Sequence, residues 1–184
     1  RRVLIVVPET LVHQWLVEML RRFNLHFKIF DRNRCDDLLT DNDFENIFHS
    51  EQLVLCSIDF LAGNASVYEQ CVMGEWDLMV VDEAHHLLWS AEDPSIEYTM
   101  VEQLAFHTKG VLLLTATPEQ LGKESHFARL RLLDPDRFPD FQQFIDEEQN
   151  YEPYAQVIED LLNNKKLTGE DISLIKTTFD EGDN

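Results

Sequence analysis

The sequence predicts a three-layer α/β/α domain with a mostly parallel sheet, followed by a helical tail. Two observations favour this class. Short apolar runs alternate with segments of helical spacing as far as Pro118, and only helical patterns follow. The apolar runs are continuous instead of alternating with polar residues, which is typical of strands buried on both faces of a parallel sheet.

The strands are predicted where apolar residues run together over a strand's length. Polar or turn-forming residues bound each run, and a shorter stretch near the N-terminus alternates like one further strand. The predicted strands are Val3–Val7, Leu25–Phe30, Leu53–Ile58, Asp77–Val81 and Val111–Leu114.

Helices are predicted between these strands. Apolar residues recur at helical spacing over Val12–Phe23, and Thr10 is a plausible N-cap for this helix. Asn64 can cap a helix that runs through Met73, which Gly74 would end. Residues 31–50 are polar and acidic, so they are predicted to be a surface excursion with a weak helix at best.

The later helices have their own signals. Asp93-Pro94 supplies a cap and a first-turn proline for a helix through about Ala105. We predict two parts to the chain, a motor-like lobe over residues 1–139 and a helical extension over residues 140–184. The helices predicted after Pro118 are Ser125–Leu133, Asp140–Asn150, Pro153–Leu162 and Gly169–Thr178.

Composition excludes several classes of protein. Hydrophobic residues make up 44% of the 184 residues, too many for a disordered chain. No run approaches the roughly 18 apolar residues of a membrane helix, so no membrane partner is expected. The three cysteines form no C-x-x-C pair, which favours reduced, buried thiols and a cytoplasmic protein.

The charge is strongly acidic and unevenly distributed. The chain has 15 basic and 35 acidic residues and a formal net charge of −20. Residues 1–34 nevertheless hold seven Lys and Arg against three Asp and Glu. Long-range repulsion opposes the approach of phosphates, so any contact with nucleic acid is expected in the basic N-terminal part.

Two adjacent acids follow the predicted strand Asp77–Val81. Asp82 and Glu83 would lie at the carboxyl end of that strand, the edge at which open parallel sheets bind ligands. An acid there can hold Mg²⁺, and its neighbour can polarise an attacking water. This is the logic of the second motif of P-loop ATPases. A solvated acidic turn is the alternative, but the continuation Ala84-His85 and a second motif downstream favour the catalytic interpretation.

Two threonines follow the strand Val111–Leu114. Thr115 and Thr117 flank the small residue Ala116, and such hydroxyls can hydrogen-bond to acids on a neighbouring strand. Alone, this is an ordinary exit from a strand. Its position after the acid pair, with one helix between, favours a functional role.

The end of the first strand leads into a helix. Pro8, Glu9 and Thr10 form this entry, where free N–H groups and the positive end of the helix dipole suit a phosphate. A capped crossover helix fits these residues equally well. Ser57 repeats the arrangement more weakly after the strand Leu53–Ile58. Trp15, on the first helix, is interpreted as a core residue, not as a platform for stacking bases.

These blocks resemble the first motor lobe of the superfamily-two helicase-like ATPases, and within them the Swi/Snf branch. The signatures of that branch are a P-x-x-L-x-x-Q-W helix start, a DEAH or DEGH box and an L-L-L-T-A-T-P strand. They correspond to residues 8–15, 82–85 and 112–118. The resemblance covers most of residues 1–140, and the fold that it implies is a RecA-like motor lobe.

The resemblance also implies ATP and Mg²⁺ as cofactors. Asp82 would sit on the Mg²⁺ of bound ATP, and Glu83 would orient the hydrolytic water. His85 would link the γ-phosphate site to the third motif. The motif as a whole, with Ala84, is the expected catalytic segment.

The remaining motif residues receive coupling and binding roles from the same resemblance. Thr115, Ala116 and Thr117 would couple hydrolysis to movement between the lobes. Residues 8–10, and more weakly Ser57, would touch the phosphate backbone of the tracked strand. The partners implied are double-stranded DNA and RNA polymerase, with a role in transcription recycling.

One family motif has no counterpart. No G-x-x-x-x-G-K-[ST] occurs in the 184 residues. We therefore expect a lobe truncated before its first, P-loop strand, which is inactive by itself. In this fold family the P-loop strand lies beside Val111–Leu114. That strand would then be an exposed edge, through which the chain self-associates unless a neighbouring segment covers it.

Two kinds of alternative function stay open at this point. One is the motor lobe of another relative, such as a restriction-enzyme translocase or a DEAH RNA helicase, from which the helical region after Pro118 distinguishes it. The other is a non-enzymatic interaction module on a motor fold. Degeneration of Asp82 or Glu83 would indicate such a module, and both acids are intact.

Overall fold

A computed structural model of the chain describes residues 1–41, 44–116, 122–163, 165, 168 and 169. The chain divides into two compact units, Arg1–Pro139 and Asp140–Asn184. None of the described helices is both long enough and apolar enough to cross a membrane.

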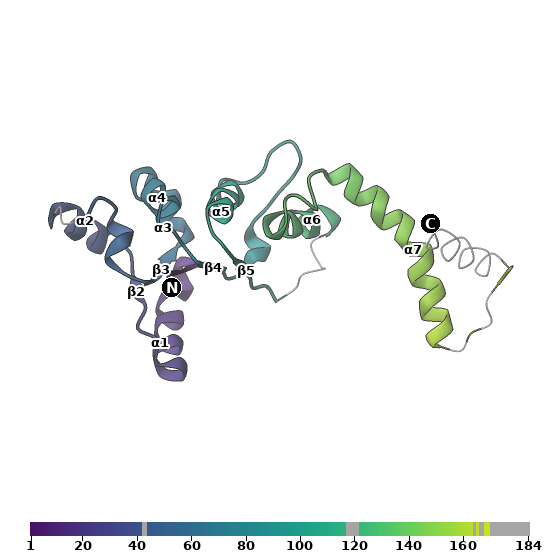
Figure 1. The fold of residues 1–184 in the computed structure, drawn as a ribbon, viewed down its shortest axis with the longest axis horizontal. Coiled ribbons are helices and arrows are strands. Elements are labelled where there is room, and N and C mark those ends of the chain that lie inside the picture. Colours follow the sequence, from purple (N-terminus) through teal and green to yellow (C-terminus); the bar gives the residue numbers. More distant parts are fainter. Residues whose placement is uncertain (42–43, 117–121, 164, 166–167, 170–184) are drawn as a thin grey trace. The chain divides into compact units, whose positions relative to one another are not determined.

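The first unit contains a five-stranded sheet in the order β2-β3-β1-β4-β5 (Figure 1). All neighbouring strands are parallel, so the predicted sheet type is confirmed. Ile58 belongs to the helix that follows β3 and not to the predicted strand, and β2 is shorter than predicted. The strands are β1 (Val3–Val7), β2 (Lys28–Ile29), β3 (Leu53–Ser57), β4 (Leu78–Val81) and β5 (Val111–Leu113).

Helices cover both faces of this sheet, which confirms the three-layer class. α1 (Val12–Phe23) lies on one face, while α3 (Ile58–Ala62), α4 (Ala65–Val72) and α5 (Ile96–Phe106) lie on the other (Figure 1). Because side chains alternate along a strand, β1 contributes to both layers. Its residues Ile5 and Val7 pack on the α1 side, and Leu4 and Val6 pack in the larger opposite core.

The entry into α1 differs from the prediction. A 3₁₀ turn, η1 (Glu9–Leu11), comes first, and the Leu11 N–H donates to the Pro8 carbonyl at 2.9 Å. Thr10 lies inside this turn, and neither η1 nor α1 has a side-chain cap, so the predicted Thr10 cap is wrong. Pro8 leaves the strand in an extended conformation, with φ −57° and ψ 145°, and the chain tightens before the α-helix begins.

Other helix starts are also corrected. Ser95, not Asp93, caps α5: its hydroxyl accepts the Tyr98 N–H at 3.1 Å. Asp93 lies in the preceding loop, two residues before the N-cap Ser95, and its N–H donates to Ser90 Oγ at 3.0 Å. Asn64 does flank α4, but its side-chain amide donates to a carbonyl of the preceding helix instead of capping.

Residues 31–50 are more ordered and more buried than predicted. They form α2 (Arg32–Asp41) and the 3₁₀ turn η2 (Ile47–Ser50). Phe48 is fully buried, with its ring centroid 4.8 Å from that of Phe30 and 6.0 Å from that of Trp76. The polar average of this segment conceals two apolar residues that reach the core from a single short turn.

The tail also differs from its prediction. α6 (Gly122–Leu133) ends the helices of the first unit, and a single helix, α7 (Phe141–Leu162), replaces the two predicted over residues 140–162. A proline removes one N–H donor and need not end a helix, so the expected break before Pro153 is wrong. The helix predicted over Gly169–Thr178 falls almost wholly outside the described residues.

In the described sheet β5 is an edge strand. It pairs only with β4, and Leu112 at its centre is 46% exposed. An apolar edge of this kind can pair with another strand. Self-association of the chain through β5 stays a prediction.

Candidate active site at the carboxyl ends of the strands

Three predicted site segments meet because their strands are neighbours. Val7 pairs with Ser57, and Val6 pairs with Val81, so the residues that follow these positions share one edge of the sheet. The Asp82 N–H donates to the Val6 carbonyl at 3.0 Å, which extends the pairing one residue beyond β4. The parallel register therefore brings the acid pair beside Pro8 and Ser57.

The Asp82 carboxylate accepts two hydrogen bonds from uncharged donors. Its Oδ1 accepts the Glu83 N–H at 2.9 Å, and its Oδ2 accepts the indole N–H of Trp15 at 2.7 Å. Among the described residues no Lys, Arg or His forms an ion pair with this carboxylate. Asp82 is thus held in place while its negative charge is left unneutralised.

Glu83 has an unusual backbone conformation. Its φ of 52° and ψ of 40° lie in the left-handed region, which costs a residue with a Cβ about 1–2 kcal/mol. It is the N-cap of the 3₁₀ turn η3 (Ala84–His86), so this conformation turns the chain sharply after β4. Strained residues of this kind cluster at functional sites.

Glu83 and His85 lie close together after that turn. His85 Nδ1 is 3.0 Å from Glu83 Oε2, and both side chains are partly exposed. The contact lacks the angles of a hydrogen bond, and the Nδ1 atom has no other partner in the described part of the chain. It is therefore a charge contact that strengthens when His85 is protonated, and the ring nitrogen can still bond to another group.

Backbone bonds join the acid turn to the exit of β5. The Ala84 N–H donates to the Leu114 carbonyl at 2.9 Å, and the Leu114 N–H donates to the Val81 carbonyl at 2.8 Å. Ala84 is fully buried. Thr115 follows directly, and its Oγ1 is buried with no hydrogen-bond partner in the described segments.

The threonine motif is only partly covered by the structure. Thr115 does not bond to Asp82 or Glu83 through its hydroxyl, and Ala116 is exposed. Thr117 lies outside the described residues. The predicted contact between the threonine hydroxyls and the acids is therefore absent at Thr115 in this structure, although the two motifs are joined through the backbone.

The predicted nucleic-acid residues gather around the ends of β1 and β3. Glu9 and Thr10 are exposed, but the Glu9 N–H is occupied by Asp59 Oδ2 at 3.1 Å. Ser57 is only 3% exposed, and its hydroxyl accepts the Phe60 N–H at 3.0 Å as the cap of α3. Glu9 and Thr10 thus offer the exposed side chains of this group, and Ser57 is already used by the fold.

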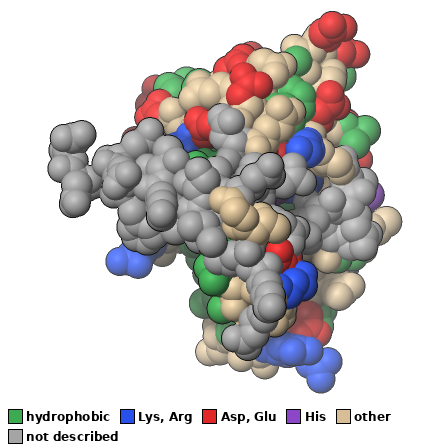
Figure 2. Space-filling model, turned by 90° about the vertical axis from the view of Figure 1, so that its right-hand side faces the viewer, with side chains coloured by type: hydrophobic (Ala, Val, Ile, Leu, Met, Phe, Trp, Pro, Cys, Tyr) green, Lys and Arg blue, Asp and Glu red, His purple; other side chains and the backbone are tan. Residues whose placement is uncertain are grey.

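The surface charge agrees with the sequence. The chain has 35 acidic against 15 basic residues, and side chains of both signs lie on the face that Figure 2 draws. Basic residues do occur on α1, where Arg21 and Arg22 lie in the last turn. The acidic surface means that a nucleic-acid contact depends on local groups and not on the net charge.

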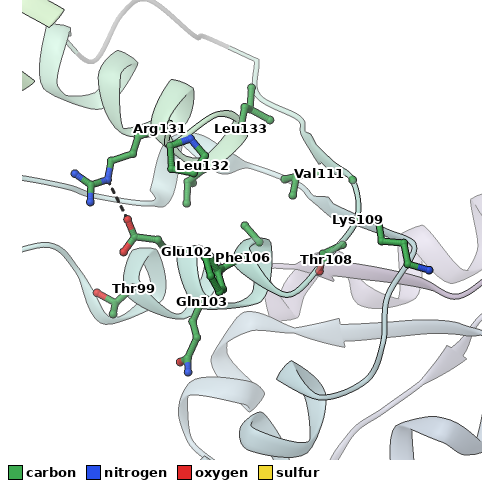
Figure 3. A pocket seen from close by; sticks show the side chains of 13 residues that line it. Thr99, Glu102, Gln103, Phe106, Thr108, Lys109, Val111, Arg131, Leu132 and Leu133 are labelled. Atoms are coloured by element: carbon green, nitrogen blue, oxygen red, sulfur yellow. Dashed lines mark hydrogen bonds and ion pairs between the residues drawn. The ribbon is translucent and has the colours of Figure 1, made fainter. Parts of the chain in front are cut away.

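A small cavity lies beside the acid pair. It measures about 40 Å³ and is lined by the ends of β1 and β4, Ile58, His86, Leu87 and Glu97. A wider pocket of about 520 Å³ lies between α5, α6 and the start of β5, where Phe106 and Leu133 line it (Figure 3). None of the predicted site residues lines that pocket.

Trp15 is the contact that reasoning from sequence missed. Its place in the helical apolar pattern suggested a core residue, and its ring does pack against the apolar layer on the α1 side of the sheet. The Q-W dipeptide after the first strand gives no sign that the indole reaches an acid 67 residues later.

These features define a class of protein. A parallel sheet with an acid pair after one central strand, and a turn into a helix after the neighbouring strand, is the arrangement of a RecA-like motor lobe. The chain belongs to the SNF2-related domain family, which matches residues 1–171. The predicted resemblance to the Swi/Snf branch is confirmed.

Curated relatives extend this comparison. The chain is 60% identical over 182 residues to the RNA polymerase-associated protein RapA of Vibrio parahaemolyticus, a match that covers 99% of the chain and 19% of the relative. The same-named protein of Yersinia pseudotuberculosis is 58% identical over the same shares. That of Vibrio atlanticus is 63% identical over 166 residues, which are 90% of the chain and 17% of the relative. The chain thus spans about a fifth of the length of these relatives.

Proposed function

We propose that these residues form part of the first motor lobe of an ATP-dependent double-stranded-DNA translocase of the Swi/Snf type. We call the longer chain in which they would act the full-length motor. The observation that carries the proposal is the acid pair Asp82-Glu83, held at the carboxyl end of β4 and bonded through the backbone to β1 and to the exit of β5. Family membership and the length of the relatives support it.

The donor set at Asp82 suits Mg²⁺ bound together with ATP. Mg²⁺ is usually held by one or two carboxylates, several waters and the phosphates of the substrate, and not by a cage of protein ligands. In agreement, no cluster of three or more metal-binding side chains occurs in the described segments. Asp82 supplies a fixed and unneutralised carboxylate, which can hold the ion directly or through water.

Glu83 would act as the general base. Bound Mg-ATP supplies the phosphoryl group to be transferred, and the protein's part is to orient a water and accept its proton. Glu83 has a left-handed conformation after β4, and its Oε2 lies 3.0 Å from His85 Nδ1. His85 would link this carboxylate to the phosphate site, because its Nδ1 atom has no hydrogen-bond partner among the described residues.

Coupling to the other parts of the motor would pass through the exit of β5. The bond from Ala84 to Leu114 ties the catalytic turn to the segment Thr115, Ala116 and Thr117. The buried Thr115 hydroxyl, which has no partner in the described residues, is available to a group that arrives with nucleotide or with a second lobe.

Nucleic acid would bind at the entry to α1. Thr10 and the neighbouring residues Pro8 and Glu9 would face the phosphate backbone, and Ser57 would support the same edge from α3. The names of the relatives suggest RNA polymerase as a partner of the full-length motor. A role in transcription recycling and a place in the cytoplasm are part of the proposal and come from the family resemblance alone.

The alternatives are less well supported. A restriction-enzyme translocase or a DEAH RNA helicase would share the acid pair, but the relatives of high identity carry neither name. A non-enzymatic interaction module would have no need of an Asp82 carboxylate that uncharged donors hold in place.

The test is the substitution Glu83→Gln in the full-length motor. The amide keeps the volume of the side chain but cannot accept a proton, so the ATPase rate should fall by about 10²–10⁴-fold. ATP binding, measured with a fluorescent analogue, should change little. The proposed role of Glu83 would be wrong if the variant retained nearly full turnover.

A further inference from the structure

The hydrogen bond between Trp15 and Asp82 joins two segments that sequence reasoning kept apart. Trp15 lies in the first turn of α1, and Asp82 follows β4. The indole Nε1 donates to Asp82 Oδ2 at 2.7 Å. An indole N–H can only donate a hydrogen bond. Its hydrogen bond to an ionised carboxylate is stronger than one to a neutral acceptor.

The Trp15 ring is held by packing as well as by this bond. It lies against the apolar layer formed by Ile5, Val7 and Val80 on the α1 face of the sheet. The position of the N–H group is therefore set by the core, before any ligand binds. The opposite oxygen of Asp82 is held by the Glu83 N–H at 2.9 Å, so both oxygens of the carboxylate have fixed donors.

A purely structural tryptophan provides the contrast. Trp76 is also packed in the core, and its indole donates to the Cys71 carbonyl at 2.7 Å, five residues away. That bond satisfies a buried donor within one local turn. The Trp15 bond instead ends on the side chain to which the proposed function assigns Mg²⁺.

We propose that Trp15 is a positioning residue for the Asp82 carboxylate. Its indole selects one side-chain rotamer of Asp82 and leaves the remaining lone pairs directed towards the ion. Because the donor is uncharged, it fixes the acid without neutralising it. Groups that orient a metal ligand from the second layer typically affect metal affinity or activity by about 10–100-fold. The inference rests on the proposed function for the identity of the ion, but not for the contact itself.

The contact can be tested in the 184-residue chain by nuclear magnetic resonance of the indole N–H groups. The substitution Trp15→Phe assigns the Trp15 signal by its loss. We expect Asp82→Ala to move the Trp15 signal upfield and to accelerate its exchange with solvent by about 10-fold, as for the loss of one hydrogen bond to a charged group. The Trp76 signal is the internal control and should stay in place. A Trp15 signal that is unchanged by Asp82→Ala would overturn the proposal.

The role is tested in the full-length motor with Trp15→Phe, which keeps an aromatic ring and removes the donor. The Mg²⁺ concentration for half-maximal ATPase should rise by about 10-fold, while the rate at saturating Mg²⁺ changes little. Trp89→Phe is the matched control, because Trp89 packs against Phe127 on the other side of the sheet.

Two outcomes contradict the role. An unchanged Mg²⁺ dependence would show that the bond does not position the acid. An equal loss of rate at every Mg²⁺ concentration would show a general structural effect of Trp15. If the unmodified motor has no ATPase activity, the proposed function fails, and the indole signal still decides whether Trp15 holds Asp82.

Discussion

The two ends of β4 carry the same residue types and use them differently. Asp77 precedes the strand and Asp82 follows it, and each carboxylate accepts one backbone N–H and one side-chain donor. At Asp77 the donors are the Arg2 N–H at 2.8 Å and the Lys109 ammonium at 2.7 Å. At Asp82 the side-chain donor is the uncharged indole of Trp15. One acid is paired with a cation, and the other has no charged partner among the described residues.

Their electrostatics follow from this difference. The hydrogen bond from Lys109 and the bond from the Arg2 backbone lower the pKa of Asp77 to about 2. Arg2 strengthens this end further, because its guanidinium donates to the carbonyls of Gly74 and Phe48 and lies over the Trp76 ring. The amino end of β4 therefore has an aspartate paired with a cation, while we propose a catalytic role for the aspartate at the carboxyl end.

A left-handed glutamate accompanies each aspartate. Glu75, with φ 54°, lies two residues before Asp77, and Glu83, with φ 52°, directly follows Asp82. At both ends the conformation allows a sharp turn next to the strand. Only Glu83 has a proposed catalytic role. A left-handed conformation is therefore not by itself a sign of function in this chain.

The largest expected effect comes from exchanging each aspartate for its amide in the full-length motor. Asp82→Asn should lower Mg²⁺-dependent ATPase by about 10²–10³-fold, the usual cost of removing one preorganised electrostatic group. Asp77→Asn is the matched control and should leave the rate nearly unchanged. Steady-state assays over a range of Mg²⁺ concentrations measure both. Equal losses in the two variants would contradict the division between the ends of β4.

The close packing of the amino end is tested by Gly74→Ala. A Cβ at this position would meet atoms of the Trp76 ring at 2.6 Å. Overpacking of this kind should lower the free energy of unfolding by about 1–3 kcal/mol, as measured by chemical denaturation of the chain. Gly63→Ala is the control, because its nearest neighbour would be a carbonyl oxygen at 3.4 Å. A loss no greater than that of the control would show that the Trp76 ring can move aside.

Replacing each left-handed glutamate by glycine should have a smaller and opposite effect on stability. Relief of the conformation, less the extra entropy of glycine, should raise the free energy of unfolding by about 0.5–1 kcal/mol at both positions. In the full-length motor, however, Glu83→Gly should abolish ATPase and Glu75→Gly should spare it. Denaturation and activity assays on the two variants decide. Loss of stability in Glu83→Gly would show that its side chain stabilises the turn more than the backbone strains it.

The smallest effect is the pH dependence of the Asp77 contacts. An unfolded aspartate has a pKa near 3.9, and the lowered folded value of about 2 means that folding favours the charged form. The contribution is fully present above about pH 4 and is lost as the pH falls towards 2. We expect the stability difference between the wild-type chain and Asp77→Asn to shrink over this window in denaturation experiments. In a Lys109→Gln background, the stability difference made by Asp77→Asn should already be smaller at pH 5, because the largest cause of the lowered Asp77 pKa is removed. A constant difference from pH 5 to 2 would contradict the assignment.

Much of the fold follows from the sequence alone. The apolar runs at residues 3–7, 53–57 and 78–81 form strands covered on both faces, as is typical of short continuous apolar runs in a parallel sheet. The run at residues 111–113 is also a strand, although Leu112 is exposed at the edge of the sheet. The acid pair could be placed at a strand end for the same reason. Helix starts were less predictable, because Thr10, Asp93 and Ser95 are all acceptable caps, and the path of the preceding loop selects among them.

The remaining features were decided by the tertiary structure. Ile47 and Phe48 are buried in an otherwise polar segment because Phe30 and Trp76, distant in sequence, complete their site. The bond between Trp15 and Asp82 depends on the packing of α1 against one face of the sheet, which brings the Trp15 indole to the end of β4. Local sequence determines which residues can turn, bury or ionise. Only the long-range packing of strands and helices determines which of those groups meet. It therefore decides that Asp77 is paired with the Lys109 cation and Asp82 with the uncharged indole of Trp15.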